Sequence, residues 1–284
     1  MNNLIIGGHV SVAGGLHNAI KKGVEEEFSA LQIFVSAPQS FRVTNYSDEQ
    51  KTLFVEEYKK AGFTFLVQHA IYLINLVSDN TRLVQLSKES LLGYLKIGSE
   101  IGSIGTIVHL GSYKNGSFAG CEQQLYTVIN EITSQMAKNQ FVIVENSAGG
   151  GGKIPASLEE MASIWKNCDQ DKIRFCLDTQ HLFAAGIDVA DYGEFEDFLH
   201  RFDESIGIKN VICVHANDSK SELGSGHDRH ENIGEGFIGD TGFKNILSQR
   251  LIQNIPLILE VPGDNRGGPN KENKDRLKLM LLNK

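Results

Sequence analysis

The sequence predicts a closed parallel barrel of the (β/α)8, or TIM, class. Eight short apolar runs alternate with amphipathic helical stretches along the 284 residues. The runs are apolar almost throughout, which is typical of parallel strands whose two faces are both covered. No linker or low-complexity segment divides the chain, so we expect one domain over residues 1–284. An open, doubly wound sheet is the alternative.

The first half of the chain supplies four strands and two clear helices. The expected strands are LIIGGHV (4–10), ALQIFVS (30–36), TFLVQHA (64–70) and TIVHLG (106–111). Helical periodicity occupies 47–62 and 81–102, and these segments open with Ser47 and Thr81. Ser and Thr are favoured at helix starts because their side chains accept hydrogen bonds from free backbone amides.

The second half repeats the same alternation. The expected strands are FVIVENS (141–147), IRFCLDTQH (173–181), NVICVHAND (210–218) and IPLILEVP (255–262). The helical segments are 121–138, 157–168, 192–207 and 241–254. Alternating strands and helices of these lengths indicate βαβ units and a parallel sheet.

Composition restricts the class of protein. Hydrophobic residues make up 41% of the chain, enough for a large core, and no apolar stretch reaches the roughly 18 residues of a membrane span. The formal net charge of −8 argues against a protein that holds a polyanion by bulk charge. The first residues do not resemble a signal peptide, so we expect a cytoplasmic protein. The four cysteines show no CxxC spacing and are expected to be buried thiols.

Ionisable side chains gather at the carboxyl ends of the expected strands. They are His69, His109, Glu145, Asp178, His181, His215 and Glu260. One such residue can simply cap a loop, but in a barrel seven of them converge on the rim where active sites lie. Clustered carboxylates and imidazoles without Lys or Arg would repel and desolvate one another. A cation is therefore expected among them.

The loop after the seventh strand adds two further candidate ligands, Asp228 and His230, in a D-x-H sequence flanked by glycines. The nine candidates are five imidazoles and four carboxylates, a set that suits zinc or manganese in a catalytic site. Nine ligands exceed the need of one ion, so two or three ions are expected. Such multi-ion sites are typical of phosphoester hydrolysis.

Three other features have open or weaker interpretations. The string Gly234 to Gly239 matches G-x-G-x-x-G, but no strand leads directly into it, so it is expected to shape the metal loop and not to bind a dinucleotide. The glycines at 149–152 either contact a phosphate or form a mobile turn. His9, at the end of the first strand, has either a hydrogen-bonding or substrate role, or a structural one.

Six strings together resemble the endonuclease IV family of apurinic/apyrimidinic endonucleases, in order and over essentially the whole chain. They are GGHVSVAGG (7–15), HAIYLINL (69–76), VENSAGGGG (144–152), CLDTQHLFAAGID (176–188), HANDSKSELGSGHDRHENIGEGFIG (215–239) and LILEVPG (257–263). The resemblance implies a TIM barrel that holds three zinc ions. Because His and carboxylate ligands accept manganese as well, manganese can replace zinc at one or more sites. The resemblance further implies hydrolysis of the phosphodiester 5′ to an abasic site in duplex DNA, leaving a 3′-hydroxyl, and cleaning of blocked 3′ ends.

The resemblance also implies a partition of the ligands. His69, His109 and Glu145 would bind one ion; Glu145 would bridge to a second, held by Asp178, His215 and Glu260; and His181, Asp228 and His230 would bind a third. A metal-bound hydroxide oriented by the catalytic Glu145 would then attack the phosphorus.

DNA contacts implied by the resemblance involve Tyr72 and Gln39, and Arg229 is expected to contact the DNA through its charge. Tyr72 follows the third strand where the family inserts an aromatic residue at the lesion. Gln39 stands where the family often has Arg, which weakens the expected probing of the lesion and leaves hydrolysis unaffected. We expect a monomer that has no membrane contact.

The main alternative is a divalent-metal sugar isomerase or epimerase of the xylose-isomerase-like barrels. Those enzymes need one or two ions, so Asp228 and His230 would be superfluous.

Metal binding would also change the charge of the protein. Three divalent ions would add six positive charges to the formal net charge of −8 and leave −2, with the positive charge concentrated on the rim.

Overall fold

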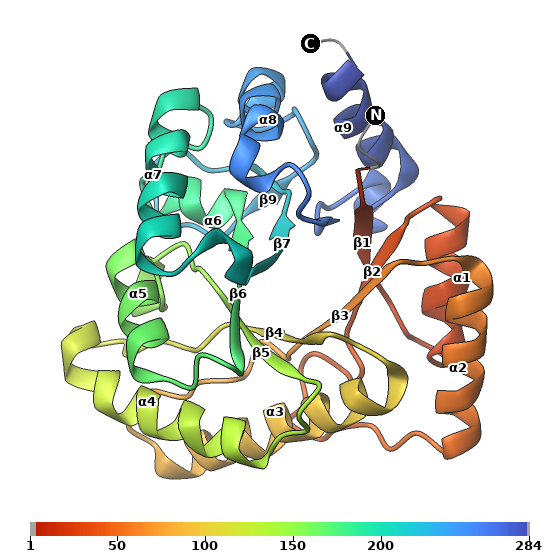
Figure 1. Ribbon diagram of the computed structural model, residues 1–284, viewed down its shortest axis with the longest axis vertical. Coiled ribbons are helices and arrows are strands. Elements are labelled where there is room, and N and C mark those ends of the chain that lie inside the picture. Colours follow the sequence, from red (N-terminus) through yellow and green to blue (C-terminus); the bar gives the residue numbers. More distant parts are fainter. Residues whose placement is uncertain (1–3, 283–284) are drawn as a thin grey trace.

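Eight parallel strands close into a barrel in the computed structural model, which describes residues 4–282 (Figure 1). The strands are β1 (Ile6–Val10), β2 (Ala30–Ile33), β3 (Phe65–His69), β4 (Gly105–Val108), β5 (Phe141–Glu145), β6 (Ile173–Asp178), β7 (Val211–His215) and β10 (Leu257–Leu259). Neighbours in sequence are neighbours in the barrel, and β10 pairs with β1 to close it. The predicted closed barrel is therefore confirmed, and the open sheet is wrong.

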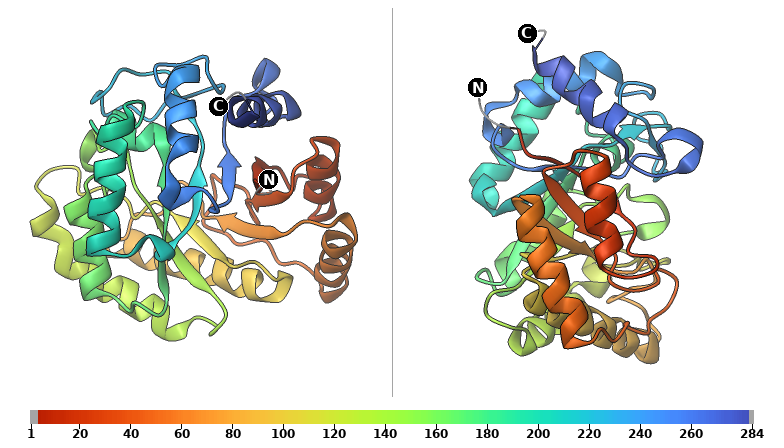
Figure 2. Two further views of the ribbon diagram at one scale, coloured as in Figure 1. Left: turned by 45° about the horizontal axis from the view of Figure 1, so that its top comes forward. Right: turned by 90° about the vertical axis from the view of Figure 1, so that its right-hand side faces the viewer.

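Helices surround this barrel on its outside (Figures 1 and 2). The helices are α1 (His17–Glu25), α2 (Asp48–Ala61), α3 (Thr81–Ile101), α4 (Phe118–Gln135), α5 (Leu158–Asn167), α6 (Thr179–Ala184), α7 (Tyr192–Ser205), α8 (Gly239–Ser248) and α9 (Lys271–Leu282). Short 3-10 turns lie at Gly150–Gly152, Ile208–Asn210, Arg250–Ile252 and Asp264–Arg266. The predicted helical segments do not include α1, α6 and α9. The sequence prediction also extended α8 through residues that form a separate 3-10 turn.

Polar caps begin several helices as the sequence predicts. The Ser47 hydroxyl accepts from the Gln50 amide, and the Gln50 side chain accepts from the Ser47 amide, a reciprocal capping box. Ser157 likewise caps α5. For α3 the cap is Asn80, whose side chain accepts from two amides of the first turn, and not the predicted Thr81.

Side chains inside the barrel form an apolar layer below the rim. A cluster of fully or almost fully buried residues fills this layer: Ala30, Phe65, Val67, Ile107, Ile143, Cys176, Cys213 and Ile258. Successive side chains of a strand point to opposite faces, so a residue two positions further along a strand points inward again, one layer higher. The layer above the apolar one therefore lies at the rim.

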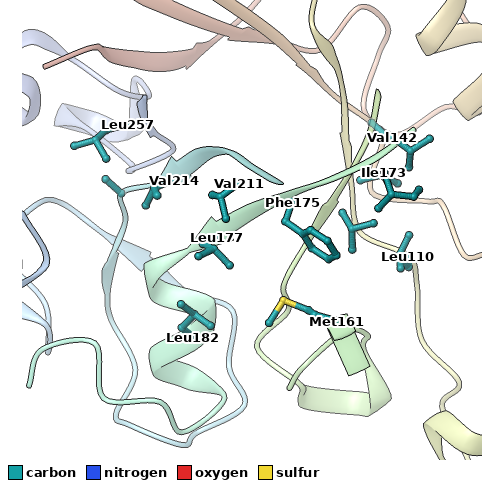
Figure 3. Close-up of a cluster of buried hydrophobic side chains, with 14 of the residues drawn as sticks. Leu110, Val142, Met161, Ile173, Phe175, Leu177, Leu182, Val211, Val214 and Leu257 are labelled. Atoms are coloured by element: carbon teal, nitrogen blue, oxygen red, sulfur yellow. The ribbon is translucent and has the colours of Figure 1, made fainter. Parts of the chain in front are cut away.

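A second hydrophobic core fills the space between the barrel and the helices. Figure 3 shows Phe175 and Leu177 of β6 directed toward α5 and α6, which carry Met161 and Leu182. These four side chains are at most 1% exposed. Packing on this outer face fixes the strand register and leaves the inner face free to carry polar side chains at the rim.

The structure also tests the remaining sequence predictions about the chain. All four cysteines are free and buried, as their spacing predicts. Within residues 4–282, no helix is both long and apolar enough to cross a membrane. The predicted sixth strand, 173–181, is too long, because the chain leaves the strand after Asp178 and enters α6 at once. The predicted seventh strand, 210–218, ends at His215.

Candidate metal centre

The rim layer carries most of the ionisable residues that the sequence singled out. Each lies two positions after a member of the apolar layer: His69 after Val67, His109 after Ile107, Glu145 after Ile143, Asp178 after Cys176, His215 after Cys213 and Glu260 after Ile258. Strand alternation turns all six inward. His109 and Glu260 lie one position beyond the hydrogen-bonded strands β4 and β10.

Three candidate ligands reach the same place by other elements. His181 lies in the first turn of α6, where its amide donates to the Asp178 carboxylate at 2.8 Å. Asp228 and His230 come from the loop after β7. This loop is tied down by the short antiparallel strands β8 (Asp218–Ser219) and β9 (His230–Glu231).

Glu145 lies at the centre of the candidate ligands and is fully buried. Its Oε2 is 3.1 Å from Nε2 of His69 and 3.4 Å from Nε2 of His109. Its Oε1 is 2.9 Å from Nδ1 of His215 and 3.4 Å from Nδ1 of His181. The two oxygens therefore face different imidazoles, the arrangement that a carboxylate bridging two ions requires.

The candidate ligands form three groups. His69, His109 and Glu145 offer ligand atoms within 4.8 Å of one another, and so do Glu145, Asp178, His215 and Glu260. The third group is formed by Asp178, His181 and His230. Asp228, which the resemblance assigns to this group, lies beside it: its Oδ1 is 3.2 Å from Nε2 of His181 and 3.6 Å from Nε2 of His230. Asp178 therefore belongs to two groups, and its Oδ2 lies 3.8 Å from Nε2 of His230.

Backbone carbonyls orient the imidazole rings of His69 and His181. Nδ1 of His69 lies 2.7 Å from the Ala70 carbonyl, and Nδ1 of His181 lies 3.0 Å from the Asn146 carbonyl. A carbonyl can only accept, so each ring carries a proton at Nδ1 and turns Nε2 toward the carboxylates. Within the described residues, the Nε2 atoms of His181 and His230 are buried and make no hydrogen bond, although Oδ1 of Asp228 lies 3.2 and 3.6 Å from them. Such orphaned nitrogens fit a site for divalent metal ions.

The pKa values show how strongly the cluster demands positive charge. Burial lowers the pKa of His109 to about 4, so this imidazole is neutral near pH 7. Burial also disfavours the charged form of His215, but Glu260 and Glu145 outweigh it and raise the pKa of His215 well above its usual range. Burial would raise the pKa of Glu145, yet His109 and His215 lower it well below its usual range. Protons or metal ions must therefore balance these buried carboxylates.

Buried amide side chains that the sequence analysis missed hold the carboxylates in place. Nδ2 of Asn217 donates to Oδ2 of Asp178 at 2.7 Å, and its Oδ1 accepts from the Glu260 amide at 2.8 Å. Oδ1 of Asn146 accepts from the Asp178 amide at 2.7 Å. Asn146 directly follows Glu145, and Asn217 lies two positions after His215, so their closeness to candidate ligands in the sequence was a usable signal.

Asp218 organises the glycine string after the metal loop. Its buried carboxylate accepts hydrogen bonds from the amides of Ser219, Gly236, Ile238 and Gly239. A Cβ on Gly236 would lie 2.3 Å from the Ser219 carbonyl oxygen, so only glycine fits there. The string therefore shapes the loop and contacts a carboxylate of the protein. This arrangement agrees with the interpretation that set aside dinucleotide binding.

Gln32 and His9 complete the rim layer on β2 and β1. Nε2 of Gln32 is 2.5 Å from Oε1 of Glu260, and Oε1 of Gln32 is 2.7 Å from Nε2 of His215. Nδ1 of His9 lies 2.8 Å from Oε1 of Glu260. Of the roles left open for His9, the structure supports hydrogen bonding. Gln32 was not predicted.

A cavity of about 560 Å³ opens above the candidate ligands. Tyr72, Lys153 and Arg229 line it together with several of the histidines. Tyr72 is 63% exposed, so its ring is available for contact with a large ligand. Gln39 is also exposed and lies in the loop between β2 and α2. Nζ of Lys153 is 3.2 Å from Oδ2 of Asp228.

The glycine-rich loop after β5 lies against the metal loop. A Cβ on Gly150 would meet the Gly226 carbonyl oxygen at 2.1 Å, so these two backbones approach as only glycines allow. The loop is a tight backbone contact at the edge of the cavity, where Gly226 is part of the lining. Neither open interpretation of residues 149–152, phosphate contact or mobile turn, is tested by this contact.

Comparison with known proteins places the chain among related sequences and folds. A family model described as a xylose isomerase-like TIM barrel matches residues 20–281. The "Probable endonuclease 4" of Haloarcula marismortui is 34% identical over 92% of this chain and 93% of its own length. The crystal structure of endonuclease IV from Thermus thermophilus aligns with a TM-score of 0.86 and 29% identity, covering 98% and 99% of the two chains. A D-tagatose 3-epimerase-like protein aligns with a TM-score of 0.72 and 21% identity, covering 98% and 97%, which shows the shared fold alone.

Proposed function

Because this chain belongs to the endonuclease IV family of the xylose isomerase-like TIM barrels, we propose that it is a DNA repair endonuclease. It hydrolyses the phosphodiester 5′ to an abasic site in duplex DNA, leaves a 3′-hydroxyl, and cleans blocked 3′ ends. It acts as a monomeric cytoplasmic enzyme with three zinc ions, with manganese able to replace zinc at one or more sites.

One observation carries this proposal: three groups of ligand atoms share a rim, and the buried Glu145 belongs to two of them. Four carboxylates and five imidazoles would supply enough ligands for three ions, and the Nε2 atoms of His181 and His230, buried without a hydrogen bond within the described residues, would be free to bind one. Divalent ions bound there would act as Lewis acids, supply a hydroxide nucleophile near neutral pH and neutralise charge on the phosphate.

The protein's own groups hold and orient the reacting parts. Glu145, fixed between imidazoles on both oxygens, would orient the nucleophile. Lys153 and Arg229 line the cavity and would attract the DNA backbone as point charges. Tyr72 would occupy space in the duplex at the lesion, where flipping out a sugar without a base costs least. Gln39 would contact the DNA from the loop after β2.

The decisive experiment is incision of a duplex oligonucleotide that contains one tetrahydrofuran abasic analogue. The zinc-loaded protein is expected to nick the strand 5′ to the analogue and to leave a 3′-hydroxyl that a polymerase extends. Glu145→Gln is expected to abolish nicking and to retain most DNA binding. The matched control is Glu56→Gln, at an exposed position of α2, which should cut as the wild type does. Absence of incision by protein shown to contain its metal ions would refute the proposal.

A further inference from the structure

Gln32 is a fully buried polar residue in the rim layer that is not itself a candidate ligand. It lies two positions after Ala30 of the apolar layer, so β2 points it inward at the level of the ligands. Its amide contacts two of the four residues that form the second ligand group, Glu260 and His215. A buried amide in this place must satisfy its hydrogen bonds with these neighbours.

The orientation of the Gln32 amide is determined by Glu260. Oε1 of Glu260 lies 2.5 Å from one end of the amide, and an ionised carboxylate can only accept hydrogen bonds. The NH2 group must therefore face Glu260, and the carbonyl oxygen must face His215. The same NH2 group lies 3.0 Å from Nδ1 of His9, which belongs to the same network.

The carbonyl oxygen in turn determines the proton position on His215. Nε2 of His215 is 2.7 Å from Oε1 of Gln32, so this nitrogen must carry the proton. In a neutral ring the lone pair is then on Nδ1. That atom faces three carboxylate oxygens: Oε1 of Glu145 at 2.9 Å, Oε2 of Glu260 at 3.2 Å and Oδ2 of Asp178 at 3.6 Å.

His215 differs in this respect from three other candidate ligands. His69, His181 and His230 each direct Nδ1 toward a backbone carbonyl, at 2.7, 3.0 and 3.3 Å. A backbone carbonyl is present whatever the side chains are. The tautomer of His215 instead depends on a side chain, so a single substitution can release it.

We propose that Gln32 is a positioning residue for the second metal ion. It fixes the His215 tautomer that presents Nδ1, and it holds Oε1 of Glu260 so that Oε2 turns toward that same nitrogen. This inference rests on the metal centre of the proposed function and adds a determinant to it. Partners that orient a metal ligand typically change metal affinity by about 10- to 100-fold when they are removed.

The test compares Gln32→Met with Gln68→Met in otherwise identical full-length protein. Gln68 is an equally buried glutamine on the neighbouring strand β3, where its amide lies against backbone groups of Tyr94 and Gly98 on α3. Metal-free protein is titrated with zinc by calorimetry, and bound zinc is counted by mass spectrometry after dialysis. Nitrogen chemical shifts of the His215 ring report its tautomer in the zinc-loaded state.

Gln32→Met is expected to bind one of the three ions about 10- to 100-fold more weakly and to lose the uniform Nε2–H form of His215. Gln68→Met is expected to keep the wild-type affinity for all three ions, even where it lowers thermal stability. Gln32→Leu gives a second variant if the methionine variant folds poorly. If a folded Gln32 variant keeps the wild-type zinc affinity and the wild-type tautomer of His215, the inference is wrong, but the proposed metal centre is unaffected. Wild-type protein that binds no zinc would overturn the metal centre itself, and with it the inference.

Discussion

Asp218 provides a quantitative test of how the metal loop is anchored. Its carboxylate is buried and accepts from four backbone amides, two on each oxygen. Oδ1 accepts from Ser219 and Ile238 at 2.7 and 3.0 Å, and Oδ2 accepts from Gly236 and Gly239 at 3.0 and 3.2 Å. Asp218→Asn preserves the shape of the side chain and replaces one acceptor oxygen with a donor NH2 group. In either amide orientation, two backbone amides then face a donor.

The magnitude follows from those two lost hydrogen bonds. A buried donor left unsatisfied costs about 1–3 kcal/mol, so Asp218→Asn should lower the free energy of unfolding by about 2–6 kcal/mol. At about 2.1 cal/mol/K per residue, the unfolding entropy of 284 residues is about 0.6 kcal/mol/K. The melting temperature is therefore expected to fall by about 3–10 °C.

The assay is thermal unfolding of the metal-free protein followed by calorimetry, so that zinc binding does not contribute. The control is Asp240→Asn on α8, which removes the carboxylate from a partly exposed pair with Arg276. That pair should contribute less than about 1 kcal/mol, or less than about 2 °C. A decrease for Asp218→Asn no larger than that of the control would refute the view that this carboxylate anchors the loop.

Two further predictions concern DNA. Tyr72→Ala should weaken binding to abasic duplex by about 5- to 150-fold, because about 1–3 kcal/mol of aromatic stacking is lost, and it should leave the zinc content unchanged. Binding is measured by fluorescence anisotropy. An equal loss of affinity for undamaged duplex would contradict a role at the lesion. Lys153→Gln should lower the slope of log affinity against log salt by about 1, as expected for one lost phosphate contact, whereas Lys21→Gln on the exposed face of α1 should leave the slope unchanged.

Much of the barrel could be predicted because a local apolar run in the sequence indicates each strand. The same apolar runs predicted the candidate ligands, since a polar residue at the carboxyl end of a buried barrel strand lies at the rim. The position of His181 was predicted correctly but on the wrong element. If the strand continued past Asp178, the side chain of His181, three residues later, would point to the opposite face, away from the site. Instead α6 begins at Thr179, and the helical turn directs His181 toward the site.

Other features of the site depend on contacts that no local pattern records. The hydrogen bonds of Asp218 reach residues about twenty positions away, beyond the loop that carries Asp228 and His230. Gln32 is an intermediate case. It interrupts an apolar run, and its spacing of two from Ala30 repeats the spacing of the six strand-borne ligands. What could not be foreseen was its partners, Glu260 and His215, because strand closure alone brings β2, β7 and β10 to one rim.

The acidity of the chain is compatible with a phosphate substrate because the relevant charge is local. Three of the 35 carboxylates, those of Glu145, Asp178 and Glu260, lie in the rim layer above the apolar layer, and Asp228 lies beside them on the loop after β7. Desolvation makes each buried anion costly unless a cation balances it. Three divalent ions would more than balance these four charges and leave the rim positive, beside Lys153 and Arg229. A protein with a net charge of −8 would then bind DNA through a few local contacts, and undamaged duplex would be held weakly at physiological salt.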